Sequence, residues 1–156
     1  MQKFTQKGDM WASPEVIDET TEFPDQETAL APIKFDFAEL RFMNSYGTRN
    51  LIRFIKSWQP KDFEYHNCPP VLVELFNVVD ALLGTPPDIR FLKSFKIPFF
   101  DPDSDSIQDI LFLTDEVSLD QGDFSFTESA LKRLKDNMVS EVEPDEYLAF
   151  YDRVNQ

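Results

Sequence analysis

The sequence contains few of the residues on which redox and phosphate-binding sites depend. Its 156 residues include one cysteine (Cys68), one histidine (His66) and four glycines. A single cysteine excludes an intrachain disulfide and a zinc site built on several cysteines of one chain. Four scattered glycines do not form a glycine-rich loop that could cradle a phosphate. We interpret Cys68 as a small buried apolar residue and His66 as a structural or surface residue.

A catalytic constellation is also missing. A Ser-His-acid hydrolase would need His66 close to a serine in a sharp elbow between a strand and a helix, and the sequence shows no such elbow. Residues 101–109 imitate a calcium loop, but its sixth place holds Ser106 instead of glycine and its twelfth holds Phe112 instead of glutamate. We therefore predict no catalytic residues, no cofactor and no metal site, and a protein that is not an enzyme.

Long apolar runs are absent as well. No run approaches the ~20 residues that a membrane-spanning helix needs. The first ten residues, MQKFTQKGDM, lack the apolar core of a signal peptide. We therefore expect a cytoplasmic protein that does not associate with a membrane.

Basic residues are scarce at both ends of the chain. The net charge is −14, from 15 Lys and Arg against 29 Asp and Glu. Residues 31–100 carry a net charge of +2, whereas residues 101–156 carry 4 basic and 15 acidic side chains, a net charge of −11. A surface this acidic repels phosphate backbones, which argues against nucleic acid as a partner. The acidic tail serves either solubility or the binding of a basic partner.

What the sequence does contain is organised around residues 32–58. Apolar residues alternate with polar ones from Ile33 and continue to Met43, which predicts a buried strand. Apolar residues then recur at helical spacing from Leu51 to Trp58. The turn Asn44–Gly47 lies between the two, and we predict that Ser45 caps the helix by accepting a free backbone N–H.

Further strands and helices follow the same alternation. The remaining predicted elements are strands at 62–66, 89–95 and 107–117, a helix over 71–83 with Gly84 as its C-cap, a polar loop at 118–123, a helix capped by Thr127, and a final helix over 144–154. This order predicts an α/β fold with a four- to five-stranded mixed sheet and helices packed on it. We assign residues 1–97 to this domain and residues 98–156 to a small, acidic α+β extension that packs on it or follows it.

The organising stretch carries a resemblance to a known family. The segment FDFAELRFMNSYGTRNLIRFIKSW resembles the core of the STAS domain, the fold of bacterial anti-sigma factor antagonists. In that family a strand ends in Phe-(Met/Ile)-Asp-Ser-Ser-Gly, and the serine after the Asp is phosphorylated by a partner kinase that also acts as the anti-sigma factor. The matching run here is Phe42–Gly47, in which Asn44 and Tyr46 replace the Asp and the second Ser.

Two other runs agree with the family, so the resemblance covers about residues 8–97. Residues Glu15–Glu19 are similar to the run that opens the family's first helix. Residues Cys68–Phe76 resemble the helix that follows its fourth strand.

The resemblance implies a non-enzymatic protein-binding module of bacterial signalling and transcription regulation, whose partner is an anti-sigma factor or a similar serine kinase. Ser45 is then the phosphoacceptor candidate. A phosphate there would meet free N–H groups of the first helical turn and would add about −1.5 to −2 charges to the docking surface. The residues predicted to contact the partner are Asn44, Tyr46, Gly47, Thr48, Arg49 and Arg53.

Other interpretations stay open. Ser45 could be a plain N-cap, and Arg49 and Arg53 could form an ordinary solvated face. The same fold could serve as a scaffold or assembly component without phosphorylation. A small-ligand binder or an enzyme is the remaining alternative, and a pocket lined by convergent polar groups away from Ser45 would favour it.

The tail is similar to a zinc ribbon that has lost its cysteines. Residues Pro98–Phe100 and Glu146–Phe150 resemble the opening and closing runs of such tails. The cysteine positions of such a tail fall near Asp101, Ser104, Leu131 and Leu134. None of these residues supplies a thiolate, so we expect a tail without zinc that is held by apolar contacts.

Overall fold

The computed structural model describes residues 2–25, 32–58, 63–84 and 86–154. Its first sheet has the strand order β1-β2-β4-β6. The four strands are β1 (Thr5–Lys7), β2 (Met10–Ala12), β4 (Ile33–Asp36) and β6 (Phe63–His66). Strands β2, β4 and β6 are parallel, and β1 pairs with β2 in the antiparallel direction. The predicted α/β class is confirmed, and this sheet is mixed.

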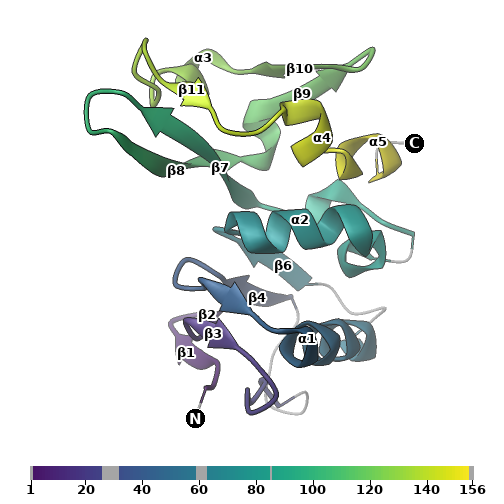
Figure 1. Ribbon diagram of the computed structural model, residues 1–156. Coiled ribbons are helices and arrows are strands. Elements are labelled where there is room, and N and C mark those ends of the chain that lie inside the picture. The colour runs from purple at the N-terminus through teal and green to yellow at the C-terminus, as the bar shows by residue number, and fades with distance from the viewer. Residues whose placement is uncertain (1, 26–31, 59–62, 85, 155–156) are drawn as a thin grey trace.

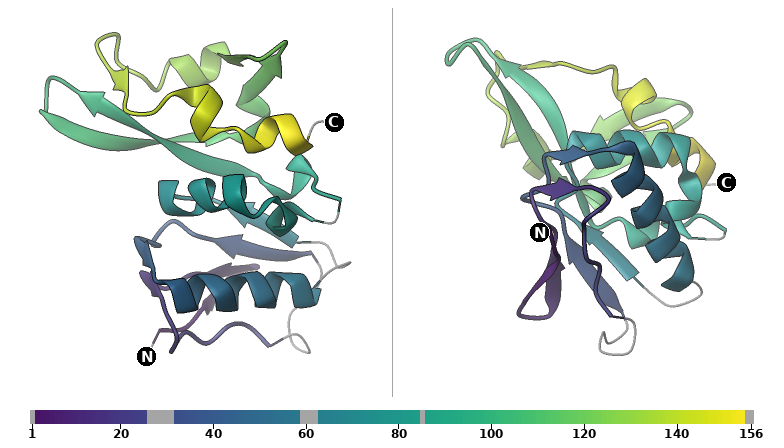
Figure 2. Two further views of the ribbon diagram at one scale, coloured as in Figure 1. Left: turned by 45° about the vertical axis from the view of Figure 1, so that its right-hand side comes forward. Right: turned by 60° about the horizontal axis from the view of Figure 1, so that its bottom comes forward.

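Both long helices cover the same face of this sheet (Figures 1 and 2). Helix α1 spans Ser45–Trp58 and helix α2 spans Pro70–Val78. The Phe54 ring of α1 lies 5.8 Å from the ring of Phe35 on β4, and the Phe76 ring of α2 lies 5.2 Å from the ring of Tyr65 on β6. Phe35 and Tyr65 are register partners, so their side chains share one face.

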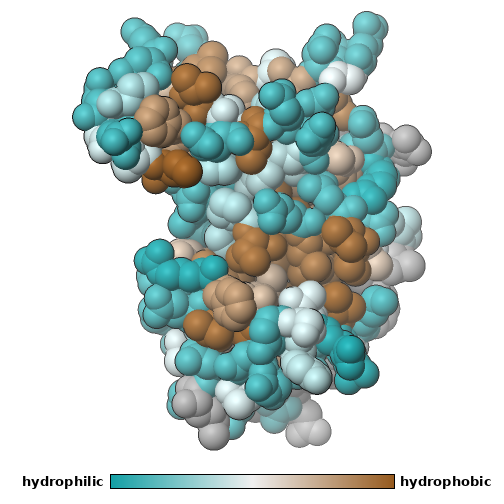
Figure 3. All heavy atoms as spheres, in the orientation of Figure 1, coloured by the Kyte–Doolittle hydropathy of each residue, from teal (hydrophilic) through white to brown (hydrophobic). Residues whose placement is uncertain are grey.

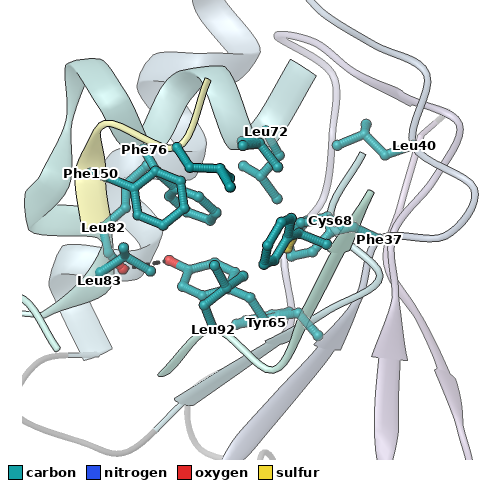
Figure 4. Packing of buried hydrophobic residues seen from close by; sticks show 14 of the residues in the cluster. Phe37, Leu40, Tyr65, Cys68, Leu72, Phe76, Leu82, Leu83, Leu92 and Phe150 are labelled. Carbon is teal, nitrogen blue, oxygen red and sulfur yellow. Dashed lines mark hydrogen bonds between the residues drawn. The ribbon is translucent and has the colours of Figure 1, made fainter. Parts of the chain in front are cut away.

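Aromatic rings fill the core beneath the two helices (Figure 4). The chain has 16 phenylalanines, and many of them are buried in one cluster that includes residues of both halves of the chain. The Tyr65 hydroxyl is buried there and donates a hydrogen bond to the Leu82 carbonyl at 2.7 Å (Figure 4). This bond satisfies the only polar atom of the Tyr65 side chain.

The predicted strand from Ile33 to Met43 is two strands. Strand β4 ends at Asp36, whose carboxylate accepts the Ala38 backbone N–H at 3.0 Å and so starts a turn. Strand β5 (Phe42–Met43) then pairs in parallel with β3 (Val16–Ile17) in a separate two-stranded sheet. The run Glu15–Glu19 therefore contributes a strand and a turn, not the opening of a helix.

A polar cluster joins the C-terminal ends of β4 and β6 to strand β7 (Ser94–Asp101). The Asn67 amide donates to the Asp36 carboxylate at 2.8 Å, and the Asn67 backbone N–H donates to the Ser94 hydroxyl at 2.7 Å. Asn67 has a φ of 57°, a conformation that asparagine tolerates better than most residues. This cluster lets the chain leave β6 and enter α2 directly.

The connection from α2 to β7 contains two short 3-10 helices. These are η1 (Asp80–Leu83) and η2 (Ile89–Phe91). The strand predicted over 89–95 is wrong for its first half, because the Asp88 carboxylate accepts the Arg90 backbone N–H and caps a helical turn. The helix predicted over 71–83 is interrupted, because α2 ends at Val78 and Gly84, with a φ of 105°, ends η1 instead.

The second half of the chain forms two further sheets. A three-stranded sheet has the order β11-β7-β8, and β9 pairs with β10. The strands are β7 (Ser94–Asp101), β8 (Ser106–Leu113), β9 (Val117–Asp120), β10 (Asp123–Phe126) and β11 (Val139–Ser140). The helices are η3 (Thr114–Glu116), α3 (Glu128–Leu131), α4 (Pro144–Tyr147) and α5 (Phe150–Val154).

Several predictions for this half need correction. The strand predicted to reach Val117 ends at Leu113, and the predicted polar loop at 118–123 is a hairpin of β9 and β10. The final predicted helix is two short helices. Thr127 caps α3 as predicted, because its hydroxyl accepts the Ala130 N–H at 3.3 Å.

The C-terminal helices α4 and α5 pack against the end of α2 (Figure 1). The Asn77 amide donates to the Tyr147 carbonyl and accepts the Phe150 N–H, both at 2.9 Å. The Arg153 guanidinium donates to the carbonyls of Phe76 and Asn77, which are free at the end of the helix. The tail thus completes the C-terminus of α2.

The predicted division between residues 97 and 98 falls inside β7. The first residues of this strand lie beside β6 through the Cys68–Phe95 bridge, and its later residues pair with β8 and β11. Within the described part of the chain, no helix is long and apolar enough to cross a membrane.

Candidate functional site

The turn that enters α1 is capped by Asn44, not by Ser45. The Asn44 carboxamide oxygen accepts the Gly47 backbone N–H at 2.7 Å, and the Asn44 carbonyl accepts the Thr48 N–H at 2.9 Å. The predicted N-cap is therefore wrong by one residue. Ser45 is the first residue of the helix, so its hydroxyl is not used as a cap.

Strand β3 holds this turn in place. The Asn44 backbone N–H donates to the Ile17 carbonyl at 3.2 Å, and the Asn44 amide donates to the Glu19 carboxylate at 2.7 Å. Gly47 is buried, and a Cβ atom there would lie 2.1 Å from the Ile17 carbonyl oxygen. Gly47 was predicted to contact the partner, but it is packed against β3 and not at the surface. It permits the close approach of α1 and β3.

The loop after β3 is itself fixed by hydrogen bonds. The Asp18 carboxylate accepts the Thr20 hydroxyl at 2.7 Å and the Thr20 N–H at 2.9 Å. The bond from the Thr20 hydroxyl is the main reason that the pKa of Asp18 lies below its usual value. The Thr21 hydroxyl accepts the Asp18 N–H at 2.9 Å. Residues 17–21 thus form an ordered support for the start of α1.

Exposed side chains surround Ser45 on this support. Ser45 is itself exposed, Phe42 is 56% exposed, and Tyr46 is 60% exposed. The guanidinium carbon of Arg49 lies 5.9 Å from the centre of the Tyr46 ring, which is within the range of a cation–π contact. We call the exposed set Phe42, Ser45, Tyr46, Arg49 and Arg53 the α1 docking surface.

The two arginines of this surface are exposed and take no part in an ion pair with any described residue. Their charges are therefore not compensated by the carboxylates that dominate the chain. Thr48 is half-buried and Asn44 is engaged in the cap, so the structure leaves these two predicted contact residues less available than Tyr46 and the arginines.

Apolar side chains also gather on the same side of the molecule, between α2 and α1 (Figure 3). Val78 of α2 is 81% exposed, and Val71 and Leu75 are half-buried. Isolated exposed valines are ordinary on a protein surface, but a gathered apolar area is typical of a protein-binding face.

The other residues considered from the sequence have structural environments. Cys68 is fully buried as predicted, and burial raises the pKa of its thiol. The His66 ring lies 2.9 Å from the Glu64 carboxylate. The Ser94 hydroxyl is bonded to Asn67 and not to His66, so this pair lacks the hydrogen bond between nucleophile and base that a hydrolase needs.

The segments compared with a zinc ribbon do meet, but an ion pair joins them. The Lys135 ammonium lies 2.8 Å from the buried Asp101 carboxylate, and its hydrogen bond is the main cause of a lowered Asp101 pKa. Asn137 also donates to Asp103 at 2.9 Å. Leu131 is 50% exposed, but Leu134 packs against the core, so apolar contacts hold the tail together with this ion pair. Among the described residues, no group of His, Cys, Asp and Glu is placed to hold a metal ion.

Two features of this site were not predicted from the sequence. One is the exposure of Phe42 on the docking surface, and the other is the support that residues 17–21 give to the turn. The apolar run that contains Phe42 predicts a core strand residue, yet its strand has only two residues and lies outside the main sheet. The support from residues 17–21 involves a segment 25 residues before the turn. The motif Asp18-x-Thr20-Thr21, with its hydroxyls after an Asp, was the available signal for an ordered turn.

Comparison of the chain with protein-family models, with curated proteins and with solved structures gave no significant match. The resemblance to the STAS domain therefore depends on the sequence motifs alone.

Proposed function

We propose that this protein is a non-enzymatic protein-binding module of the anti-sigma factor antagonist type. It binds a partner through the α1 docking surface, and Ser45 is its phosphoacceptor. This role places the protein in the cytoplasm of a bacterium, with a kinase-like anti-sigma factor as the partner. The observation that carries the proposal is an exposed serine between two exposed aromatic side chains on a turn that hydrogen bonds hold rigidly.

The fold supports a STAS-like assignment in its general plan. An antiparallel first pair of strands is followed by parallel strands, and the chain passes from a strand through the Ser45 turn into a helix that packs on the sheet. The first 97 residues supply this part, and the acidic tail packs on α2.

The chemistry of the surface predicts an acidic and partly apolar partner. Phe42 and Tyr46 supply apolar area that a partner would remove from water, and aromatic and arginine side chains are frequent hot spots of protein interfaces. Arg49 and Arg53 can each pair with a carboxylate in two hydrogen bonds. The strongly negative remainder of the chain would repel such a partner elsewhere and orient it toward this face.

Phosphorylation of Ser45 would act as a switch on this surface. The backbone N–H groups of Ser45 and Tyr46 form no hydrogen bond with another described residue, and they lie at the positive end of α1. A phosphate can accept from them, so the fold should tolerate it. It would also place about two negative charges beside Glu19 and in front of an acidic partner, which opposes docking.

The test is capture of the partner with matched variants. Wild type, Ser45→Asp, Tyr46→Ala and Ser104→Asp are used as baits in an extract of the source cells. Ser104 is an exposed serine in the turn between β7 and β8, so it controls for added charge away from the site. We expect one partner to be retained by wild type and Ser104→Asp and lost by the other two. Equal recovery with all four baits would overturn the proposal.

Phosphopeptide mass spectrometry of the protein from cells separates the switch from a constitutive scaffold. Phosphate on Ser45 supports the switch. A partner that is lost with Tyr46→Ala, together with a Ser45 that stays unmodified even when the captured kinase is supplied, would leave a scaffold on the same surface.

A further inference from the structure

A large cavity lies far from the Ser45 turn in sequence. Its volume is about 670 Å³, within the range of small-molecule sites. It forms where the end of β6, η2 and the start of β7 meet η3, β9 and α5. None of the residues of the α1 docking surface lines it.

The walls of this cavity are mainly apolar. Ile89 and Leu92 come from the segment before β7, and Leu113, Val117 and Leu119 come from the segment after it. Tyr151 of α5 adds an aromatic wall, and its hydroxyl donates to the Thr114 carbonyl at 3.3 Å, which fixes the ring. The cavity therefore suits a ligand with an apolar body.

The charged residues of the lining reverse the balance of the whole chain. Acidic residues outnumber Lys and Arg 29 to 15 in the sequence, yet the cavity is lined by Arg90 and Lys93 against Asp115 alone. The Asp88 carboxylate binds Arg90 through two nitrogen atoms, and Glu64 binds His66. Lys93 is exposed and is in no ion pair with a described residue, which leaves its ammonium group for a ligand.

Thr114 lies next to Lys93 in the backbone. The Thr114 backbone N–H donates to the Lys93 carbonyl at 3.0 Å, so these two residues are neighbours on the cavity wall. The Thr114 hydroxyl oxygen is shielded from solvent and has no hydrogen-bond partner among the described residues. Because this oxygen has almost no accessible surface, it offers no contact to a ligand in the cavity, and Lys93 supplies the polar contact.

We propose that this cavity binds a small organic carboxylate with an apolar body, whose carboxylate pairs with the Lys93 ammonium group. One lysine without an ion pair and predominantly apolar walls fit a ligand with a single carboxylate and an apolar body. This site is separate from the docking surface, so it goes beyond the proposed protein-binding function.

The test uses octanoate as the probe and calorimetric titration of the full chain. Octanol and octyltrimethylammonium share the apolar chain and differ in charge. We expect octanoate to bind more tightly than both. Lys93→Gln should weaken octanoate about tenfold, since it removes a charge-assisted hydrogen bond, and should leave octanol unchanged. Lys132→Gln is the matched control, because Lys132 is an exposed lysine outside the cavity.

The position of the probe is checked separately. Leu119→Trp fills the cavity and should abolish binding of octanoate and octanol together, with the circular dichroism spectrum showing that the variant is folded. Amide signals of Lys93 and Thr114 should shift when octanoate is added to the wild type. The proposal is overturned if octanoate does not bind, if octyltrimethylammonium binds equally well, or if Lys93→Gln and Lys132→Gln behave alike. A failed partner capture would leave this result unaffected.

Discussion

Replacing Gly47 by alanine tests whether β3 holds the start of α1. The added Cβ would lie 2.1 Å from the Ile17 carbonyl oxygen, 2.5 Å from the Ile17 carbonyl carbon and 2.7 Å from the Asp18 nitrogen. All three are backbone atoms, so no side chain can rotate away. The helix and the strand would have to separate by roughly 1 Å to restore an ordinary contact, which is the kind of overpacking that costs ~1–3 kcal/mol.

The separation would also weaken two hydrogen bonds that join the same elements. The Asn44 N–H bonds to the Ile17 carbonyl at 3.2 Å, and the Asn44 amide bonds to Glu19 at 2.7 Å. Each such bond contributes ~1 kcal/mol. Alanine is favoured over glycine in a helix by about 1 kcal/mol, which acts in the opposite direction. We therefore expect Gly47→Ala to lower the free energy of unfolding by about 2 kcal/mol.

Urea unfolding followed by circular dichroism measures this change. The pair Arg53→Gly and Arg53→Ala gives the intrinsic preference for alanine at an exposed position of the same helix. The difference in the free energy of unfolding between Arg53→Ala and Arg53→Gly gives the expected gain from alanine alone. If Gly47→Ala raises the free energy of unfolding by that same amount, then β3 does not lie against α1, and the description of the Ser45 turn is refuted.

Three other predictions concern single contacts. Asn44→Ala should lower the free energy of unfolding by ~1 kcal/mol in the same urea assay, because Asn44 caps α1. Ser45→Ala should lower it by less than half of that, because Ser45 is not the cap. Equal losses would contradict the cap assignment. Glu116→Gln should make the stability of the protein depend less on pH. The hydrogen bonds of Arg133 lower the pKa of Glu116 from 4.5 to about 2, so in the wild type this stabilisation is present above pH 4.5 and is lost as the pH falls toward 2. Melting temperatures of the two proteins that change in parallel between pH 2 and pH 6 would contradict this. Asn77→Ala removes two hydrogen bonds that hold α4 and α5. It should therefore lower the free energy of unfolding by ~1–3 kcal/mol and speed amide hydrogen exchange in residues 144–154. Unchanged exchange there would argue against the packing of the tail on α2.

The parts of the fold that were predictable depend on local pattern. Helix α1 and strand β6 have clear periodicity, and the structure contains both. The position of the cap was not predictable, because Asn44 and Ser45 are both good capping residues. Only the close contact of Gly47 with a distant strand decides between them, and this contact is not visible in a local pattern.

Some errors had a usable signal in the sequence. The hairpin of β9 and β10 alternates apolar and small polar residues on both sides of Gln121–Gly122, and both turn residues have positive φ values. A glycine between two alternating runs is a known hairpin pattern. The high content of polar residues led to the prediction of a loop. In contrast, the large cavity is built by segments between His66 and Tyr151, and no local pattern could indicate it.

Strand β7 explains why the two proposed sites belong to one folded unit. Its first residues lie next to the end of β6 through the isolated bridge between Cys68 and Phe95, and its later residues form the sheet of the tail. The Phe76 ring of α2 packs 5.8 Å from the ring of Phe150, and Phe95 packs 6.2 Å from Tyr151. Each of these fully buried aromatic side chains stabilises the fold by ~1.5–3 kcal/mol relative to exposure. A fragment that ended near residue 97 would lack Phe150 and Tyr151, so it would expose Phe76 and Phe95 and would leave the last carbonyls of α2 without Arg153. Both the partner capture and the octanoate titration therefore require the full chain, although the two surfaces share no residue.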